Sequence, residues 1–282
     1  MIIFKIASDL SKYILNKKLK NSTIGFVPTM GALHQGHISL IEKCKENSDI
    51  SVCSIFVNPT QFNDVKDFEK YPITLENDIF LLEKAGCDIL FLPSVNEIYI
   101  DEALKNKTYN LGFIETIFEG EHRPGHFNGV CMVVERLLNI VEPDYLFLGQ
   151  KDYQQCIVIK KLINLMKVNI AVIVCETERD DNGLAMSSRN KRLSDQSKMK
   201  ANIIYESFVE VKQQVNESNA EELIQKAKHN LLQNGFEKID YLSLANAETL
   251  EPINSYSKKI KTVVVVAAFI NGIRLIDNLK IN

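Results

Sequence analysis

The fold of this chain is decided by Thr23–Pro59, which reads TIGFVPTMGALHQGHISLIEKCKENSDISVCSIFVNP. The stretch opens on the β-rich run TIGFVPT and closes on a second such run, DISVCSIFVNP. Between the two runs, Ile38, Ile41 and Cys44 recur at helical spacing. Strands that are apolar on both faces and are separated by a helix are typical of a βαβ unit in a parallel sheet. The stretch therefore predicts an α/β fold.

The same alternation continues along the chain to Glu176. Three more β-rich runs follow, namely CDILFLPS, PDYLFLG and NIAVIVCE. The accompanying helical patterns are TLENDIFLLEKAG, GVCMVVERLLNIV and DYQQCIVIKKLINLM. Because helices of this length separate the strands, we expect residues 1–176 to form a Rossmann-like parallel sheet with helices on both faces.

The pattern changes over residues 177–282. A polar loop, ERDDNGLAMSSRNKRLS, is followed by a long amphipathic stretch over Asp195–Val215 and a second helical stretch over Asn219–Asn234. Near the end, Asn271-Gly272 stands between two β-rich runs and is a strong signal for a type I′ hairpin. We therefore expect a smaller C-terminal α+β domain that acts as a lid on the first.

The composition is that of a soluble globular protein. Of the 282 residues, 45% are hydrophobic and 24% are charged, which excludes a disordered, collagenous or coiled-coil chain. Lys and Arg number 33 against 36 Asp and Glu, and the formal net charge is −3. A nucleic-acid backbone requires clustered surplus cations, so this balance argues against nucleic acid as the main ligand. A local basic site for a small anion remains open.

The cysteines and the apolar runs indicate the compartment. The six cysteines form no C-x-x-C pair, and three of them lie in apolar runs, so we interpret them as buried thiols in a reducing cytosol. The N-terminal MIIFKIASDL has an apolar start that Lys5 and Asp9 interrupt, and this start is too short for the apolar region of a signal sequence. The longest uncharged apolar run, VVVVAAFI, is far below the roughly 20 residues of a membrane span. We expect a cytoplasmic protein with no membrane partner.

The turn after the first strand of Thr23–Pro59 carries two histidines. His34 and His37 lie one helical turn apart, with Gly36 between them, and we expect a helix to start near His37. A helix N-terminus offers unpaired N–H groups and a partial positive charge, which suit a phosphate. The alternative is a helix cap with two surface histidines. The chain has no G-x-G-x-x-G and no G-x-x-x-x-G-K-[ST] motif, so neither a redox dinucleotide fold nor a P-loop NTPase is supported.

The motif NPTQF places two amides just past the next strand. Asn58 and Gln61 lie at the carboxyl end of that strand, where open α/β sheets bind ligands. An uncharged amide can hydrogen-bond a hydroxyl or a carboxylate without neutralising the carboxylate as a nucleophile. The alternative is that these side chains only cap the loop.

The motif LFLGQKDYQQ again follows a strand and opens a helix. Lys151 supplies a charge for a phosphate, Asp152 can accept from ribose hydroxyls, and Gln155 lies one turn further along. The alternative is an N-capping Asp152 beside a solvated Lys151.

The motif GLAMSSRN lies in the loop between the two expected domains. Ser187, Ser188 and Arg189 bring together two hydroxyls and a guanidinium, which can hold a phosphate through charge-assisted hydrogen bonds. The alternative is a polar linker.

Taken in order, these motifs resemble the pantothenate synthetase (pantoate–β-alanine ligase) family from Thr23 almost to the end of the chain. The resemblance also covers FEGEHRPGHFNGV, IDYLSLANAETLEPI and IRLIDN. His34–His37 is similar to the H-x-G-H signature of the wider nucleotidyltransferase superfamily, and Met186–Arg189 is similar to its K-M-S-K-S loop. NPTQF and GQKDYQQ narrow the resemblance to the ligase family.

The resemblance implies an ATP-dependent ligase that joins (R)-pantoate to β-alanine through a pantoyl adenylate and releases AMP and pyrophosphate. The implied cofactors are ATP, as a substrate, and Mg²⁺, and the implied assembly is a homodimer. The implied nucleotide-binding residues are Pro28, Thr29, Met30, His34, His37, Gly149, Lys151, Asp152, Met186, Ser187, Ser188 and Arg189. The implied catalytic residues among them are His34, His37, Lys151, Ser187, Ser188 and Arg189.

For pantoate, the resemblance implies contacts from Asn58, Gln61 and Gln155, and for the metal it implies Asp78. Two positions depart from the family pattern. Asn77 stands where relatives can carry a carboxylate, which leaves direct ligation of Mg²⁺ by the protein in doubt. Gln150 stands in place of the commoner Glu. Arg123 and His126 lie in a loop expected to be mobile or dimer-related, and no role is assigned to them.

Two other functions stay open at this point. A related nucleotidylyltransferase would join AMP to a phosphate acceptor, although the amides of Gln61 and Gln155 favour a substrate with a carboxylate and hydroxyls. A non-catalytic nucleotide-binding protein would keep the fold without turnover, since fold does not determine function. The complete set of His34, His37, Lys151 and the Ser-Ser-Arg loop argues against the second alternative.

Overall fold

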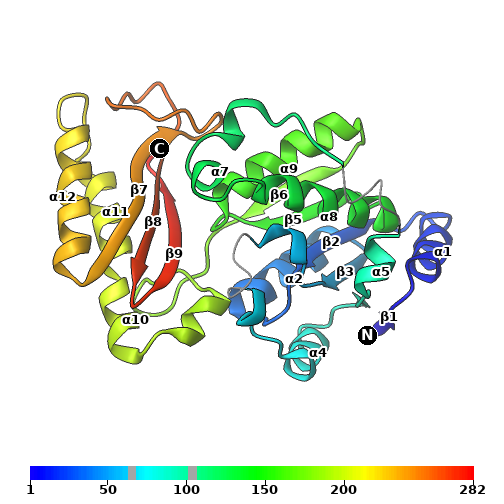
Figure 1. The fold of residues 1–282 in the computed structure, drawn as a ribbon. Helices are drawn as coiled ribbons and strands as arrows, with labels where there is room; N and C mark the ends of the chain where they lie inside the picture. The colour runs from blue at the N-terminus through cyan, green and yellow to red at the C-terminus, as the bar shows by residue number, and fades with distance from the viewer. Residues whose placement is uncertain (63–67, 101–106) are drawn as a thin grey trace. The chain divides into compact units, whose positions relative to one another are not determined.

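The computed structural model describes residues 1–62, 68–100 and 107–282, and these form two compact units (Figure 1). The first unit comprises Met1–Gly149 and Val158–Glu176, and the second comprises Gln150–Ile157 and Thr177–Asn282.

The first unit is built on a six-stranded parallel sheet. In spatial order its strands are β1 (Ile2–Phe4), β4 (Ile89–Phe91), β3 (Ile50–Ile55), β2 (Ile24–Thr29), β5 (Tyr145–Gly149) and β6 (Ala171–Cys175). All six residues of β3 are buried, as expected for a strand covered on both faces. The five strands predicted from the sequence are confirmed. The edge strand β1 was not predicted, because three residues are too few to show a period.

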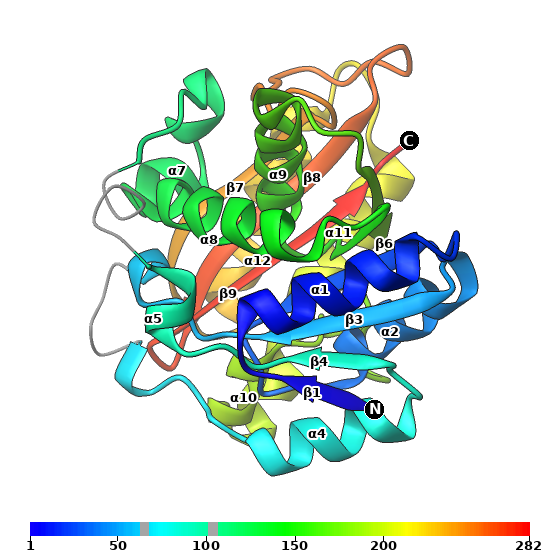
Figure 2. The ribbon, with the colours of Figure 1, turned by 90° about the vertical axis from the view of Figure 1, so that its right-hand side faces the viewer.

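Helices cover both faces of this sheet (Figure 2). Helices α1 (Ala7–Lys18) and α8 (His126–Val141) lie on one face, and α2 (Gln35–Asn47) and α4 (Leu75–Lys84) lie on the other. The shorter elements are η1 (Pro59–Gln61), α5 (Val95–Ile98), η2 (Gly112–Glu115) and α7 (Glu119–His122). The Rossmann-like fold is therefore confirmed. Within the described ranges, no helix of either unit combines the length and the hydrophobicity needed to cross a membrane.

The second unit is built on the antiparallel sheet β7 (Phe236–Asn246), β8 (Thr262–Ile270) and β9 (Ile273–Lys280). Helices α11 (Ile203–Gln214) and α12 (Ala220–Gln233) cover one face of it (Figure 1), and η3 (Ser188–Arg192) and α10 (Asp195–Ala201) precede them. Asn271 and Gly272 have φ values of 50° and 69°, as a type I′ turn requires, so the predicted hairpin is confirmed. The helix expected over 195–215 is divided at Asn202.

One short segment that precedes the expected domain boundary at 176–177 belongs to the second unit and not to the first. Gln150–Ile157, which opens helix α9 (Tyr153–Met166), belongs to the second unit. Two sets of hydrogen bonds account for this: Asn278 Nδ2 donates to the carbonyl oxygens of Gln150 and Lys151, and the Tyr153 hydroxyl donates to the Ala247 carbonyl oxygen. The division into domains at 176–177, with the second acting as a lid, stays a prediction.

The cysteines provide a direct test of the packing. All six are free thiols; five are buried and Cys175 is half-buried. Burial raises the pKa of Cys44 to about 12, of Cys87 to about 11 and of Cys131 to about 12. At neutral pH these groups are therefore neutral thiols, which are poor nucleophiles.

We expect iodoacetamide to alkylate the native protein slowly, with Cys175 reacting first. The control is the urea-unfolded chain, in which all six should react. Rapid labelling of native Cys131, measured by peptide mass, would contradict this packing.

Candidate active site

The topology of the sheet marks the place where a ligand is expected. From β2 the chain moves outward through β3 and β4, whereas β5 lies on the other side of β2 and β6 lies beyond it. In open α/β sheets, ligands bind outside the carboxyl ends of the strands where the order reverses. The loop over residues 29–34 leaves β2 at this point, and Gly149 ends β5 there. The first predicted motif therefore lies at the switch point of the first unit.

The loop after β2 is held in shape by hydrogen bonds to two side chains, those of Thr29 and Asp78. Thr29 Oγ1 donates to the Ser54 carbonyl oxygen at 2.8 Å and accepts from the Gly31 N–H at 3.2 Å. Gly31 has a φ of 78°, in the left-handed region where glycine carries no steric penalty. Pro28 and Met30 are half-buried on either side of Thr29. The loop is therefore a preformed, ordered turn.

Asp78 of α4 fixes the same loop from below. Its Oδ2 accepts from the Ala32 N–H and its Oδ1 from the Leu33 N–H, both at 2.9 Å, and Thr74 Oγ1 also donates to Oδ1 at 2.9 Å. The residue is only 1% exposed. These bonds fit a structural role rather than direct ligation of a metal. Within the described residues, no group of three or more His, Cys, Asp or Glu side chains lies together as a metal site would require. Ligation of Mg²⁺ by Asp78 stays a prediction without structural support.

His34 and His37 form a pair at the N-terminus of α2. The helix begins at Gln35, two residues earlier than expected, and His34 occupies the N-cap position. The His34 N–H donates to His37 Nδ1 at 3.3 Å, and the two ring centroids are 4.1 Å apart. Because Nδ1 accepts this bond, a neutral His37 ring carries its proton on Nε2. The pair thus lies where the helix dipole favours an anion, as expected.

Asn58 and Gln61 are joined by a hydrogen-bonded cluster. Asn58 is 1% exposed, and its Nδ2 donates to Gln61 Oε1 at 3.3 Å and to the Gly129 carbonyl oxygen at 3.1 Å. Its Oδ1 accepts from the Tyr99 hydroxyl at 2.7 Å. Since Gln61 Oε1 is occupied in this way, the amino end of the Gln61 carboxamide points the other way, toward Met30 Sδ. Asn58 therefore orients Gln61, which is more than loop capping.

Two residues without an assigned role hold the backbone of Gln61. His126 Nδ1 lies 2.7 Å from the Gln61 carbonyl oxygen, and because a carbonyl only accepts, the proton is on Nδ1. Arg123 Nη2 donates to the same oxygen at 3.2 Å, and Arg123 Nη1 lies 3.4 Å from Glu119 Oε2. Both residues thus contact the main chain of Gln61, which is a candidate substrate-binding residue.

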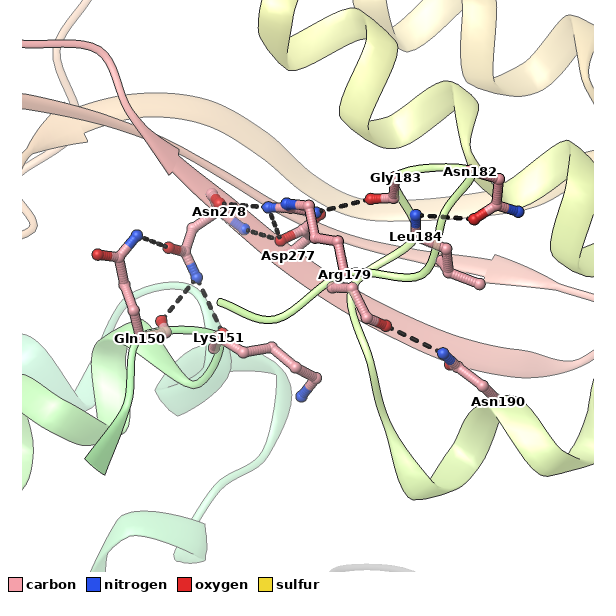
Figure 3. Close-up of polar contacts among 10 residues, drawn as sticks. Gln150, Lys151, Arg179, Asn182, Gly183, Leu184, Asn190, Asp277 and Asn278 are labelled. Carbon is pink, nitrogen blue, oxygen red and sulfur yellow. Dashed lines mark hydrogen bonds and ion pairs between the residues drawn. The ribbon is translucent and has the colours of Figure 1, made fainter. Parts of the chain in front are cut away.

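Lys151 belongs to the second unit and lies on the tight turn that follows Gly149, the last residue of β5 (Figure 3). Its ammonium lies 3.3 Å from Asp152 Oδ1, and the side chains of Lys151 and Asp152 are 17% and 47% exposed. Because the Asp152 carboxylate is open to solvent, this ion pair contributes little to stability. Both groups can therefore exchange this contact for a ligand. Gln155, one turn along α9, is half-buried.

The loop that carries Met186–Arg189 is also in the second unit. The Ser187 Oγ accepts from the Arg189 N–H at 3.3 Å, so Ser187 caps η3. Asn190 Nδ2 donates to the Ala185 carbonyl oxygen at 2.9 Å and fixes the turn (Figure 3). Ser188 is buried, while Met186, Ser187 and Arg189 are half-buried. The structure thus makes this loop an ordered cap rather than a loose linker.

A comparison with known protein families decides the identity of this arrangement. The family model described as Pantoate-beta-alanine ligase matches residues 2–280. The chain belongs to this family.

Individual members of the pantoate-beta-alanine ligase family match the whole chain. Pantothenate synthetase from Cytophaga hutchinsonii is 45% identical, covering 100% of this chain and 99% of its own. The crystal structure of the Francisella tularensis ligase, complexed with beta-gamma ATP and beta-alanine, is 41% identical with a TM-score of 0.82 and covers 100% of this chain and 98% of its own. The pantothenate synthetase structure from Thermus thermophilus is 33% identical with a TM-score of 0.90 and covers 100% of this chain and 99% of its own.

Sequence reasoning missed the residues that hold the motifs of this pantoate-beta-alanine ligase family member in place. Tyr99, which donates to Asn58, lies 41 positions away. Asn278 holds the Lys151 turn from a distant part of the second unit, and Asp277, beside it in the sequence, pairs with Arg179. Only the resemblance of IRLIDN pointed toward Asp277 and Asn278, and it assigned them no role.

Proposed function

We propose that this chain condenses (R)-pantoate with β-alanine to form pantothenate, with cleavage of ATP to AMP and pyrophosphate. The observation that carries the proposal is the match to the pantoate-beta-alanine ligase family over nearly the whole chain. The relative from Francisella tularensis, crystallised with beta-gamma ATP and beta-alanine, supports the choice of nucleotide and amine.

The first step requires no protein nucleophile, because pantoate carries one. A carboxylate oxygen of pantoate attacks the α-phosphorus of ATP, the bond from that phosphorus to pyrophosphate breaks, and pantoyl adenylate forms. Gln61 and Gln155 hold pantoate, and Asn58 keeps the Gln61 carboxamide oriented. Because these amides carry no charge, they position the carboxylate without reducing its nucleophilicity. Their contribution is alignment.

The nucleotide is bound by residues that supply positive charge and N–H donors. His34 and His37 contact the phosphates at the N-terminus of α2, next to the backbone of Pro28, Thr29 and Met30. In the second unit, Lys151 stabilises charge on the α-phosphate and Ser187, Ser188 and Arg189 bind phosphate oxygens. The ribose and adenine contacts are Gly149, Asp152 and Met186. Developing charge is thereby met by donors already in place.

The metal enters this proposal as part of the substrate MgATP. The buried carboxylate of Asp78 is occupied by two backbone N–H groups and a hydroxyl, so phosphate and water are the suitable ligands for Mg²⁺. Bound with ATP, Mg²⁺ would screen the negative charge of the triphosphate. No protein ligand is assigned to it.

In the second step, the neutral amine of β-alanine attacks the acyl carbon of pantoyl adenylate. The bond from this carbon to the bridging oxygen breaks, AMP leaves with that oxygen, and the amine loses a proton as the amide forms. The enzyme again needs to align two substrates and to stabilise a phosphate leaving group.

An assay of the products tests this function. The protein is incubated with MgATP, (R)-pantoate and β-alanine, and the nucleotides are separated by chromatography. We expect AMP, pyrophosphate and pantothenate in equal amounts, and no AMP when pantoate is left out. Release of ADP, or AMP formation that is indifferent to pantoate, would contradict the proposal.

A prediction for substrate binding concerns Gly129 of α8. A Cβ built on Gly129 would lie 2.4 Å from the Thr60 carbonyl oxygen and 3.1 Å from Gln61 Cα, so Gly129→Ala must displace the η1 turn. We expect the KM for pantoate to rise about 10-fold, the cost of weakened hydrogen bonds, with the KM for ATP little changed. The control is Gly272→Ala in the β8–β9 hairpin: its added Cβ meets nothing within 4 Å, so it adds only the backbone strain of a φ of 69° and displaces no neighbouring turn. An unchanged KM for pantoate in Gly129→Ala would show that the position of η1 does not affect binding.

We also propose that the protein is a cytoplasmic homodimer. The buried free thiols support a reducing compartment, and the resemblance to the ligase family supports the dimer. Light scattering of the purified protein would measure the mass, and a monomeric value would contradict the dimer. Cell fractionation would test the compartment.

A further inference from the structure

Asn278 of β9 holds the turn that carries Lys151. Its Nδ2 donates to the carbonyl oxygens of Gln150 and Lys151, both at 2.9 Å (Figure 3). Because both partners only accept, the amino end of the Asn278 carboxamide must face them. Its Oδ1 points away and accepts from Gln150 Nε2 at 3.2 Å. Asn278 is 1% exposed, so water does not compete for these bonds. The orientation of the turn is therefore fixed by one buried side chain.

Asp277, the preceding residue, ties the same strand to Arg179. Arg179 Nη1 donates to Asp277 Oδ2 at 2.6 Å and Nη2 donates to Oδ1 at 3.0 Å, which is the bidentate geometry of a strong pair. Asp277 Oδ1 also accepts from the Asn278 N–H at 2.7 Å. Burial raises the pKa of the Asp277 carboxyl, while the nearby Arg179 guanidinium and the Lys151 ammonium oppose that shift.

Arg179 in turn supports the base of the loop that carries Ser187–Arg189. Its Nη1 donates to the Gly183 carbonyl oxygen at 3.0 Å (Figure 3), and its guanidinium stacks 4.1 Å from the ring centroid of Tyr205. Its backbone forms an antiparallel bridge with Ala185. One hydrogen-bonded network thus links the two phosphate-binding segments of the second unit.

We propose that Asn278 is a positioning residue for adenylation, which holds the Gln150–Lys151 turn so that the Lys151 ammonium meets the charge that develops on the α-phosphate. The inference rests on the proposed function. Asn278 is 1% exposed and acts through Lys151. The effect is large because a displacement of about 1 Å can lower a rate about 100-fold.

The test substitutes the donor without changing the size of the side chain. In Asn278→Asp, an oxygen replaces the amino group that faces the two carbonyl oxygens, so an ionised carboxylate loses both hydrogen bonds and a protonated carboxyl keeps at most one. The measurement is the single-turnover rate of pyrophosphate release from saturating MgATP and pantoate without β-alanine. We expect this rate to fall about 10–100-fold, while the KM for pantoate stays close to that of the wild type.

A matched control is available four residues further along the chain. Asn282 Nδ2 also donates to two carbonyl oxygens, those of Lys258 and Ile260, at 3.3 and 3.1 Å. Asn282→Asp makes the same chemical change at an exposed position that does not contact the Lys151 turn. We expect its adenylation rate to stay within about twofold of the wild type. Thermal unfolding of both variants measures the structural cost separately from the rate.

A double-mutant cycle separates positioning from a general structural effect. If Asn278 acts through Lys151, then Asn278→Asp should change the adenylation rate less than about twofold when Lys151 is already alanine. A purely structural role would instead multiply the two losses. Such multiplication, or a wild-type rate in Asn278→Asp, would overturn the inference.

Two further outcomes have defined meanings. If Asn278→Asp does not fold, Gln150→Met serves in its place, since it removes the Gln150 carboxamide and with it the hydrogen bond to Asn278 Oδ1; we expect a fall of about 3–10-fold from the loss of one hydrogen bond, and no fall would overturn the inference. A wild-type protein that forms no AMP from pantoate and ATP would contradict the proposed function and the inference with it. An active wild type with multiplicative losses would contradict the inference alone.

Discussion

Lys151→Ala should lower the rate of pantoyl adenylate formation about 100- to 1,000-fold, as expected for the loss of one charge contact made to the transition state. The turn that carries Lys151 is held by the buried side chain of Asn278, and within the described residues the Lys151 ammonium pairs with Asp152, whose side chain is open to solvent. The charge is therefore fixed in place but available to a ligand. Because the loss lies in the transition state, kcat should fall more than the KM for ATP rises. Single-turnover release of pyrophosphate measures the effect.

The matched control for this variant is Lys160→Ala. Lys160 lies on the same helix, α9, and is exposed, so its removal tests the effect of losing one positive charge without the proposed contact. Circular dichroism and thermal unfolding should show that both variants fold. A Lys151→Ala protein that is folded and forms pantoyl adenylate at a near wild-type rate would contradict the role of Lys151.

Gln61→Ala should raise the KM for pantoate about 10- to 100-fold, the cost of losing a hydrogen bond to a charged group, and should leave the KM for ATP nearly unchanged. The physical reason is that Asn58 orients the Gln61 carboxamide and that His126 and Arg123 hold its backbone, so a preformed contact disappears. Gln61→Glu should be at least as damaging, because it places a carboxylate against the carboxylate of pantoate. Steady-state kinetics with each substrate varied in turn measure both effects.

Gln233→Ala is the control for the loss of an amide, since Gln233 is exposed on α12. It should leave both KM values at wild-type levels. If Gln61→Ala instead raised the KM for ATP and left pantoate binding intact, the assignment of Gln61 to pantoate would be wrong.

The fold could be predicted where the sequence shows a clear period over many residues. The strands β2 to β6 and helices α2, α4, α8 and α9 were found because apolar runs alternate with helical patterns. The strand β1 and helix α1 were missed. In α1 only Ala7, Leu10 and Ile14 are buried, a stripe too narrow to stand out among exposed polar residues. The hairpin at Asn271-Gly272 was found because only a few residue pairs tolerate two positive φ values.

The site could be predicted only as far as its motifs are contiguous. His34 and His37 lie within one turn of each other, and so do Asn58 and Gln61. The spacing of each pair is therefore visible in the sequence. Asn278 contacts Lys151 across 127 positions, and no spacing or periodicity indicates such a pair. For Asp78, the resemblance predicted that the residue matters. It did not predict that the Asp78 carboxylate accepts hydrogen bonds from the loop after β2, which only the structure shows.

The measurement that tests the central claim most directly is the transfer of oxygen from pantoate to AMP. The protein is supplied with MgATP, β-alanine and pantoate labelled with ¹⁸O in both carboxylate oxygens, and the AMP is examined by mass spectrometry. An acyl-adenylate route predicts one ¹⁸O in AMP and one in the amide carbonyl of pantothenate, because the bridging oxygen leaves with the phosphate. Unlabelled AMP, or ADP together with labelled inorganic phosphate, would contradict the account.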